Sequence, residues 1–215
     1  MTRIALIHAL SHSPGPINEA LARDWPDAER MNLLDDSLSA DLARTGRLDA
    51  RMTQRFMALA DYAVGTGAHG ILFTCSAFGP CIEAVARKHV TIPVLKPNEA
   101  MIDEALALAG ADGRIGLVAT FAPTLQSMPP EFPPGTALKT ALADGAMAAL
   151  NQGDLATHDR LAVEAALRLA AQGCTVIALA QFSLARARDA VALATGLPVL
   201  TTVDSAVRRL RQRLV

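Results

Sequence analysis

Residues 63–73 read AVGTGAHGILF, and residues 170–179 read AAQGCTVIAL. Each stretch passes through glycine into a short run without a polar position, from Ile71 to Phe73 in one and from Val176 to Leu179 in the other. Runs that are apolar at every position are typical of parallel strands covered by helices on both faces. The two stretches therefore predict central strands of an α/β fold.

The similarity between these stretches extends along the chain in both directions. Gly67 aligns with Gly173, and Ile71 with Ile177, at one constant separation. Further out, IPVL at 92–95 matches LPVL at 197–200, and RIALI at 3–7 matches RIGLV at 114–118. An ordered series of matches predicts internal duplication. We expect two similar lobes, each a parallel β-sheet flanked by helices, formed by residues 1–97 plus 205–215 and by residues 98–204.

Strands and helices are expected to alternate along the whole chain. Apolar runs predict strands over 3–10, 28–34, 70–74, 92–95, 114–120, 137–140, 176–180 and 197–200. Stretches rich in Ala, Leu and Arg predict helices over 50–64, 78–88, 98–109, 158–171, 184–194 and 204–214. This alternation favours parallel sheets over antiparallel ones.

The composition excludes several classes of protein. Of 215 residues, 51% are apolar, which excludes a disordered chain. A net charge of −1 and 4% aromatic residues disfavour binding to nucleic acid or to an anionic membrane. Three cysteines are too few for a disulfide framework. We therefore expect a soluble cytoplasmic protein, and the apolar composition favours a homodimer.

Candidate functional residues follow the predicted strands, because ligands of parallel sheets bind beyond the carboxyl ends of the strands. Cys75 comes directly after such a strand, between Thr74 and Ser76 and before a predicted helix. The helix start and the two hydroxyls would form an anion pocket and would favour a thiolate. Cys75 could then act as an acid or base toward a carbon beside a carboxylate. The alternative is a buried structural cysteine.

The corresponding turn of the second lobe has no cysteine. Cys75 aligns there with Gln181, whose amide can orient a ligand but cannot usefully exchange a proton near neutral pH. Other polar or aromatic side chains of the strand-end loops are candidates for binding substrate, in particular its carboxylate oxygens: Ser11, Thr120, Thr124, Phe182 and Ser183.

Two further features have alternative explanations. His8, at the end of the first strand, is either a ligand-binding or proton-carrying group or a hydrogen-bonded structural one. The run Asp35-Asp36-Ser37 is either a helix cap or a pair of acid/base or metal-binding carboxylates. No Cys or His spacing predicts a zinc site, and no glycine-rich phosphate loop is present, so we expect neither a metal nor a nucleotide cofactor.

The chain resembles the aspartate/glutamate/hydantoin racemase superfamily. The turn from Thr74 to Gly79 looks like that family's first catalytic-cysteine turn, and the turn from Leu179 to Leu184 stands where members carry a second cysteine. The resemblance implies a cofactor-independent enzyme acting on a small carboxylate such as aspartate, glutamate or a hydantoin. In the family, one thiolate removes the proton from the carbon alpha to the carboxylate, and the opposite thiol returns one to the other face.

This sequence departs from the family at Gln181, so the two-thiol mechanism cannot operate unchanged. Three interpretations remain: an isomerase in which another group such as His8 replaces the second thiol, a one-base lyase such as a decarboxylase of substituted malonates, and a carboxylate-binding protein without turnover. In the first two, Cys75 is the acid or base. Gln181 would orient the substrate.

Overall fold

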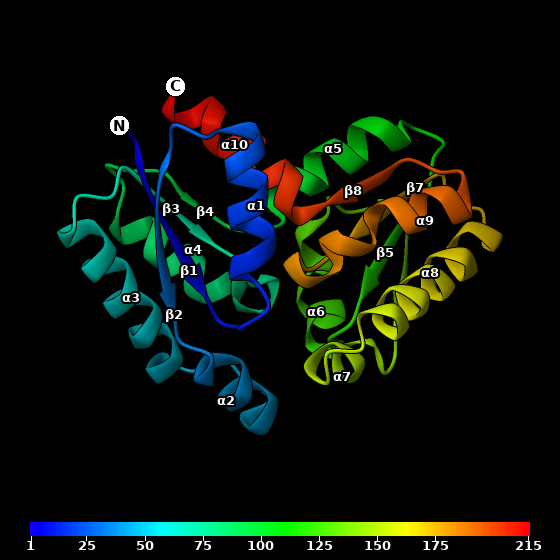
Figure 1. The fold of residues 1–215 in the computed structure, drawn as a ribbon, viewed down its shortest axis with the longest axis horizontal. Coiled ribbons are helices and arrows are strands. Elements are labelled where there is room, and N and C mark those ends of the chain that lie inside the picture. Colours follow the sequence, from blue (N-terminus) through cyan, green and yellow to red (C-terminus); the bar gives the residue numbers. More distant parts are fainter. The chain divides into compact units, whose positions relative to one another are not determined.

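The computed structural model describes all of residues 1–215 and divides into two compact units (Figure 1). The first unit contains Met1–Pro97 and Ala206–Val215, and the second contains Asn98–Ser205. Helix α10 (Thr202–Leu214) begins in the second unit and ends in the first. No helix in the protein combines the length and apolar character needed to span a membrane.

The first unit is built on a parallel sheet of four strands in the order β2-β1-β3-β4. Its strands are β1 (Arg3–His8), β2 (Glu29–Leu34), β3 (Gly70–Phe73) and β4 (Val94–Leu95). Its helices are α1 (Pro14–Asp24), α2 (Ser37–Thr45), α3 (Ala50–Gly65) and α4 (Gly79–Lys88), with a 3₁₀ turn η1 (Ser76–Phe78) before α4. The connection from each strand to its parallel neighbour therefore contains helix, as a parallel sheet requires.

The second unit repeats this plan with the strand order β6-β5-β7-β8, again all parallel. Its strands are β5 (Ile115–Ala119), β6 (Leu138–Leu142), β7 (Val176–Leu179) and β8 (Val199–Thr201). Its helices are α5 (Glu99–Ala109), α6 (Ala122–Ser127), α7 (Ala146–Asn151), α8 (Leu155–Ala171) and α9 (Arg188–Thr195), with 3₁₀ turns η2 (Pro129–Glu131) and η3 (Phe182–Ala187).

The central strands of the second unit are buried on both faces, as their uniform apolar character predicted. Alternate residues of β7 enter two different cores: Val176 and Ala178 pack with α5, whereas Ile177 and Leu179 pack with α8 and α9. Successive strand residues point to opposite faces, so a strand between two helical layers must be apolar throughout. The predicted α/β fold of two helix-flanked parallel sheets is confirmed.

The duplication also appears in the hydrogen bonds at the sheet edges. The Thr74 amide donates to the Ile7 carbonyl at 3.0 Å, and the Ala180 amide donates to the Val118 carbonyl at 2.9 Å. At the opposite ends of the strands, the His69 and Thr175 amides donate to the carbonyls of Arg3 and Arg114, both at 2.8 Å. The residues that follow Thr74 and Ala180, Cys75 and Gln181, therefore occupy equivalent positions.

The structure corrects several predicted boundaries. The first strand ends at His8 rather than at residue 10. The helix expected over 184–194 begins as the 3₁₀ turn η3 and becomes α-helical only at Arg188. Likewise, three residues of 3₁₀ turn separate Cys75 from α4, so the regular helix begins at Gly79.

Candidate active site

The carboxyl end of the first sheet brings β1 and β3 side by side, because the two strands pair in parallel from Ile4 and Gly70 onward. The hydrogen bond from Thr74 to Ile7 extends this pairing one residue beyond β3. Cys75 follows in an extended conformation, with φ −128° and ψ 117°. The cysteine thus lies at the tip of a central strand, at the edge where parallel sheets bind ligands.

The Cys75 side chain is buried, with 8% of the residue exposed. Burial raises the pKa of its thiol to about 11, although the Ala77 amide and the nearby Ser39 hydroxyl favour the thiolate and oppose the shift. The predicted donor at the helix start therefore favours the thiolate, but it does not make Cys75 a thiolate. In this structure the loss of hydration outweighs the local donors, and the resting group at neutral pH is the thiol.

His8 is fully buried beside Thr74 and holds both ring nitrogens in hydrogen bonds. Nε2 lies 2.9 Å from Oδ1 of Asn32, which also accepts from the Asn18 amide at 2.8 Å. An amide oxygen can only accept, so Nε2 of His8 carries the hydrogen. Nδ1 then accepts from the Thr74 hydroxyl at 2.9 Å. The chain Asn18–Asn32–His8–Thr74, which we call the His8 relay, fixes a neutral ring.

The His8 relay favours the structural interpretation of His8. Burial lowers the pKa of His8, although the hydrogen bond with Asn32 opposes the shift, so the ring is held neutral. Since both nitrogens are used within the unit, His8 could exchange a proton with a ligand only after breaking one of these bonds. The Thr74 hydroxyl donates its hydrogen to His8, so a carboxylate contact from that hydroxyl would require His8 to release it.

In the second unit, Gln181 is held by the neighbouring strand end. Its Oε1 accepts from the backbone amide of Thr120 at 2.5 Å and from the Thr120 hydroxyl at 3.0 Å. A backbone N–H only donates, so this contact fixes which end of the Gln181 amide faces Thr120. The Nε2 group points away from that contact and makes no hydrogen bond within the chain. It therefore keeps two N–H donors for a ligand.

Three hydroxyls of the second unit are buried without a hydrogen-bond partner, those of Thr124, Ser183 and Thr202, and the first two stand out here. They follow β5 and β7, which are neighbours in the sheet. Buried polar groups are nearly always satisfied in folded proteins, so unpaired hydroxyls at a sheet edge indicate a place for a ligand or water. Phe182, between Gln181 and Ser183, is 2% exposed.

The remaining predicted site residues lie differently. Ser11 is exposed in the loop between β1 and α1, and Ser76 is buried in η1 next to Cys75. In the run Asp35-Asp36-Ser37, Asp36 makes no capping hydrogen bond, but the Asp35 carboxylate accepts from the backbone amide and the hydroxyl of Ser37, the first residue of α2. Asp35 also forms an ion pair with Arg55 at 2.6 Å. No three His, Cys, Asp or Glu side chains are grouped as metal ligands.

Sequence reasoning missed two residues that contact the predicted ones. Ser39 on α2 lies near the Cys75 thiol with its hydroxyl buried and unpaired, and Asn32 on β2 accepts from His8. The position of Asn32 could have been noticed in the sequence, because it is a polar residue inside a strand that pairs with the apolar strand β1. Ser39 gave no such signal, because its position near Cys75 depends on how α2 packs.

A sequence model of the Asp/Glu/Hydantoin racemase family matches residues 16–210, which is most of the chain and includes both strand-end turns. The chain belongs to the Asp/Glu/Hydantoin racemase family. This confirms the resemblance inferred from the Cys75 and Gln181 turns. Among curated proteins, no sequence match was found.

Solved structures with the same fold include two racemases and a decarboxylase mutant. Allantoin racemase from Klebsiella pneumoniae is 18% identical with a TM-score of 0.75, over 99% of this chain and 87% of that one. Glutamate racemase from Francisella tularensis, in complex with D-glutamate, is 14% identical with a TM-score of 0.75, over 98% and 80%. A liganded double mutant of arylmalonate decarboxylase is 16% identical with a TM-score of 0.66, over 100% and 93%.

The pKa of Cys75 can be measured directly. In a Cys81→Ser/Cys174→Ser variant, Cys75 is the last thiol, and the ultraviolet absorbance of its thiolate should appear with a midpoint near pH 11. Burial is the cause, so the midpoint should fall toward the ordinary value of 9.0 when the protein is unfolded. Subtracting the curve of the triple variant that adds Cys75→Ser isolates the thiolate step. A folded-state midpoint below 9.0 would contradict the description of the site.

The neutral His8 should make stability fall in acid. Since burial lowers the folded-state pKa below 6.5, the unfolded chain takes up the proton more readily. The free energy of unfolding should therefore decrease as pH falls from about 7 to about 5, and chemical denaturation of His8→Gln should show a shallower decrease. Arg87→Gln, at an exposed position of α4, is the control and should retain the wild-type slope. Equal slopes in wild type and His8→Gln would refute the assignment.

Proposed function

We propose that this racemase-family chain is a cofactor-independent enzyme that moves a proton at the carbon alpha to a carboxylate, with Cys75 as the acid/base. The observation that carries the proposal is the position of Cys75 at the tip of β3, flanked by Thr74 and Ser76. Proton transfer to or from carbon needs a positioned group with a movable proton, and the thiol provides one.

Substrate carboxylate oxygens need hydrogen-bond donors. Gln181 Nε2 and the unpaired hydroxyls of Thr124 and Ser183 offer donors that the chain does not use. We propose that these groups of the second unit bind a carboxylate. The glutamate racemase with the same fold was solved with D-glutamate, a small carboxylate of this class.

The leading reaction is isomerisation of an amino acid or a hydantoin-like compound, in keeping with the family. Inversion requires a proton acceptor on one face of the carbon and a donor on the other. Gln181 cannot fill the second role, and His8 has both nitrogens engaged. An isomerase of this kind therefore takes its second proton from a group other than a thiol, such as water or a substrate amine.

A second reaction is favoured by the protonated resting state of Cys75. Decarboxylation of a substituted malonate breaks a carbon–carboxylate bond, releases carbon dioxide and leaves the electron pair on the alpha carbon as an enediolate. The Cys75 thiol then donates its proton to that carbon, and water reprotonates the thiolate. A pKa near 11 suits this role, because the group is already an acid at neutral pH. An arylmalonate decarboxylase mutant shares the fold.

Isomerisation should be visible as hydrogen exchange in heavy water. Incubated with D- and L-aspartate, D- and L-glutamate and hydantoins, the wild type should place deuterium at the alpha carbon of one of them. Cys75→Ala should lower that rate by about 100-fold or more, because it removes the proton-transfer group. Cys174→Ala, which removes a buried thiol from the segment before β7 in the second unit, should not. Exchange that is equal in wild type and Cys75→Ala would exclude this role.

The same assay has a gain-of-function arm. Gln181→Cys restores a second thiol at the position equivalent to Cys75. The resemblance to two-cysteine members of the family predicts that this variant racemises faster than the wild type, and an unchanged or lower rate would contradict a role for the second turn. Gln181→Leu should react more slowly than the wild type at low substrate concentration, mainly because its KM is higher. Leucine keeps the size of the side chain but loses the N–H donors.

The decarboxylase reaction predicts release of carbon dioxide from aryl- or alkyl-substituted malonates. In heavy water the monoacid product should carry one deuterium at the alpha carbon and be a single enantiomer, since one acid protonates one face. Cys75→Ser should lower the rate about 100-fold or more, because an alcohol is a far weaker acid than a thiol. A racemic product, or unchanged release in Cys75→Ser, would exclude the mechanism. Carboxylate binding without turnover on any of these substrates would identify a binding protein.

A further inference from the structure

The 3₁₀ turn η3, which follows β7 in the second unit, is longer than such turns usually are. It extends over six residues, Phe182–Ala187, whereas η1, at the equivalent place in the first unit, has three. Runs of 3₁₀ helix beyond three or four residues are uncommon, because their hydrogen bonds are poorly aligned. Contacts from outside the turn are therefore needed to hold η3 in this conformation.

Arg186, within η3, makes such a contact with a residue near the start of α8. Its Nε donates to Oδ1 of Asp159 at 2.8 Å, and its Nη2 donates to Oδ2 at 3.0 Å. A guanidinium group that meets both oxygens of one carboxylate fixes the direction of the contact as well as its length. We call this pair the Asp159–Arg186 fork.

A buried histidine also holds the Asp159 carboxylate. Burial disfavours the charged form of Asp159, but hydrogen bonds from Arg186 and His158 outweigh it and lower the pKa of this carboxyl. Nδ1 of His158 lies 2.8 Å from Oδ1 of Asp159, and the His158 side chain is fully buried. An ionised carboxylate only accepts, so Nδ1 carries the hydrogen. Asp159 is therefore a charged group fixed on α8 to which η3 is attached.

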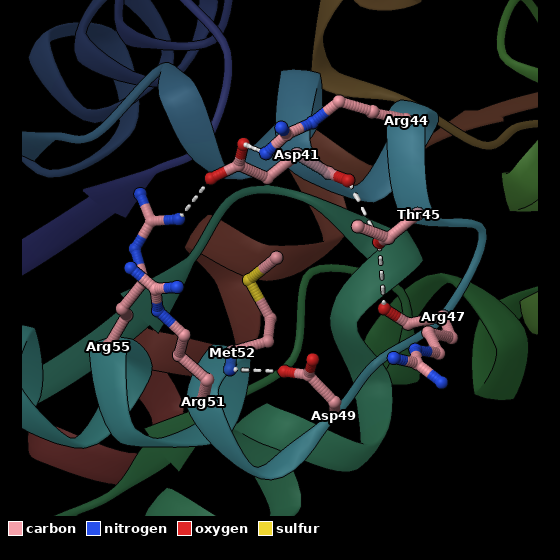
Figure 2. A pocket seen from close by; sticks show the side chains of 8 residues that line it. All are labelled: Asp41, Arg44, Thr45, Arg47, Asp49, Arg51, Met52 and Arg55. Carbon is pink, nitrogen blue, oxygen red and sulfur yellow. Dashed lines mark hydrogen bonds and ion pairs between the residues drawn. The ribbon is translucent and has the colours of Figure 1, made fainter.

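The first unit attaches its corresponding helix, α3, to a different element. Arg55 on α3 pairs with Asp41 of α2 at 2.7 Å (Figure 2). Pro80 occupies the position equivalent to Arg186 in the aligned repeat and cannot form an ion pair. The turn that carries Cys75 therefore has no counterpart of the Asp159–Arg186 fork.

The fork acts on a turn that contributes to the candidate site. η3 contains Ser183, whose hydroxyl is buried without a partner, and begins directly after Gln181. We propose that Asp159 is a positioning residue: through Arg186 it holds η3, and with it the groups that would meet a substrate carboxylate. The link to the carboxylate rests on the proposed function, whereas the effect on η3 does not.

Hydrogen–deuterium exchange of the full chain tests the effect on η3 without any substrate. The amides of residues 182–187 should exchange about tenfold faster in Asp159→Asn and in Arg186→Ala, since a charge-assisted hydrogen bond contributes on the order of a tenfold factor. Arg186→Lys should fall between these variants and the wild type, because lysine keeps the charge but cannot form the fork. Since the ion pair is partly exposed, the free energy of unfolding should change little.

Arg160→Ala is the matched control, because Arg160 pairs with Glu164 within the same helix, α8. It should leave the exchange of η3 unchanged. Wild-type exchange of η3 in both Asp159→Asn and Arg186→Ala would overturn the proposal. Equal acceleration in η3 and in β7 would also overturn it, since that result would indicate general destabilisation of the unit.

Kinetics on the substrate that the wild type accepts test the link to carboxylate binding. Asp159→Asn should raise KM about tenfold and change kcat by less than about twofold, because a group that binds the ground state and the transition state equally affects KM alone. Faster exchange of η3 with an unchanged KM would refute this link. If the wild type neither converts nor binds D-glutamate or phenylmalonate, the proposed function fails, and the exchange experiment alone decides whether Asp159 holds η3.

Discussion

The parallel pairing of the two central strands in each unit determines where every candidate functional group lies. The Thr74 amide bonds to the Ile7 carbonyl, and the Ala180 amide bonds to the Val118 carbonyl. Each bond extends the parallel pairing one residue beyond its strand, so that the next residue lies at the edge of the sheet where ligands bind. A shift in either register would move Cys75 or Gln181 off the edge and turn its side chain to the other face.

The central strands and the two equivalent turns could be predicted from the sequence, because both follow from local patterns. Uniformly apolar runs marked the central strands, and the aligned anchors around Gly67 and Gly173 revealed the repeat. Those two facts placed Cys75 and Gln181 at equivalent turns. Boundaries were less accurate where the chain tightens into 3₁₀ turns, as at 76–78 and 182–187. Such turns use the same residue types as α-helices, so periodicity does not separate them.

The protonation state of the site could not be predicted, because it depends on tertiary packing. Sequence placed a helix start near Cys75, which favours a thiolate, but the amount of hydration that Cys75 loses is set by residues distant in the chain. The same holds for His8, whose tautomer follows from Asn32 and Asn18 on other elements. Local charge gave the wrong sign for Cys75 because desolvation outweighed it.

A buried thiol with a pKa near 11 also determines how the protein meets oxidants and electrophiles. At neutral pH only about one molecule in ten thousand would carry the thiolate, which is the form that peroxides and alkylating agents attack. Many catalytic cysteines are found through their unusual reactivity, but Cys75 would be passed over by such screens. Because the thiolate fraction is low, we expect Cys75 to resist oxidation even though no second cysteine is available to reduce it.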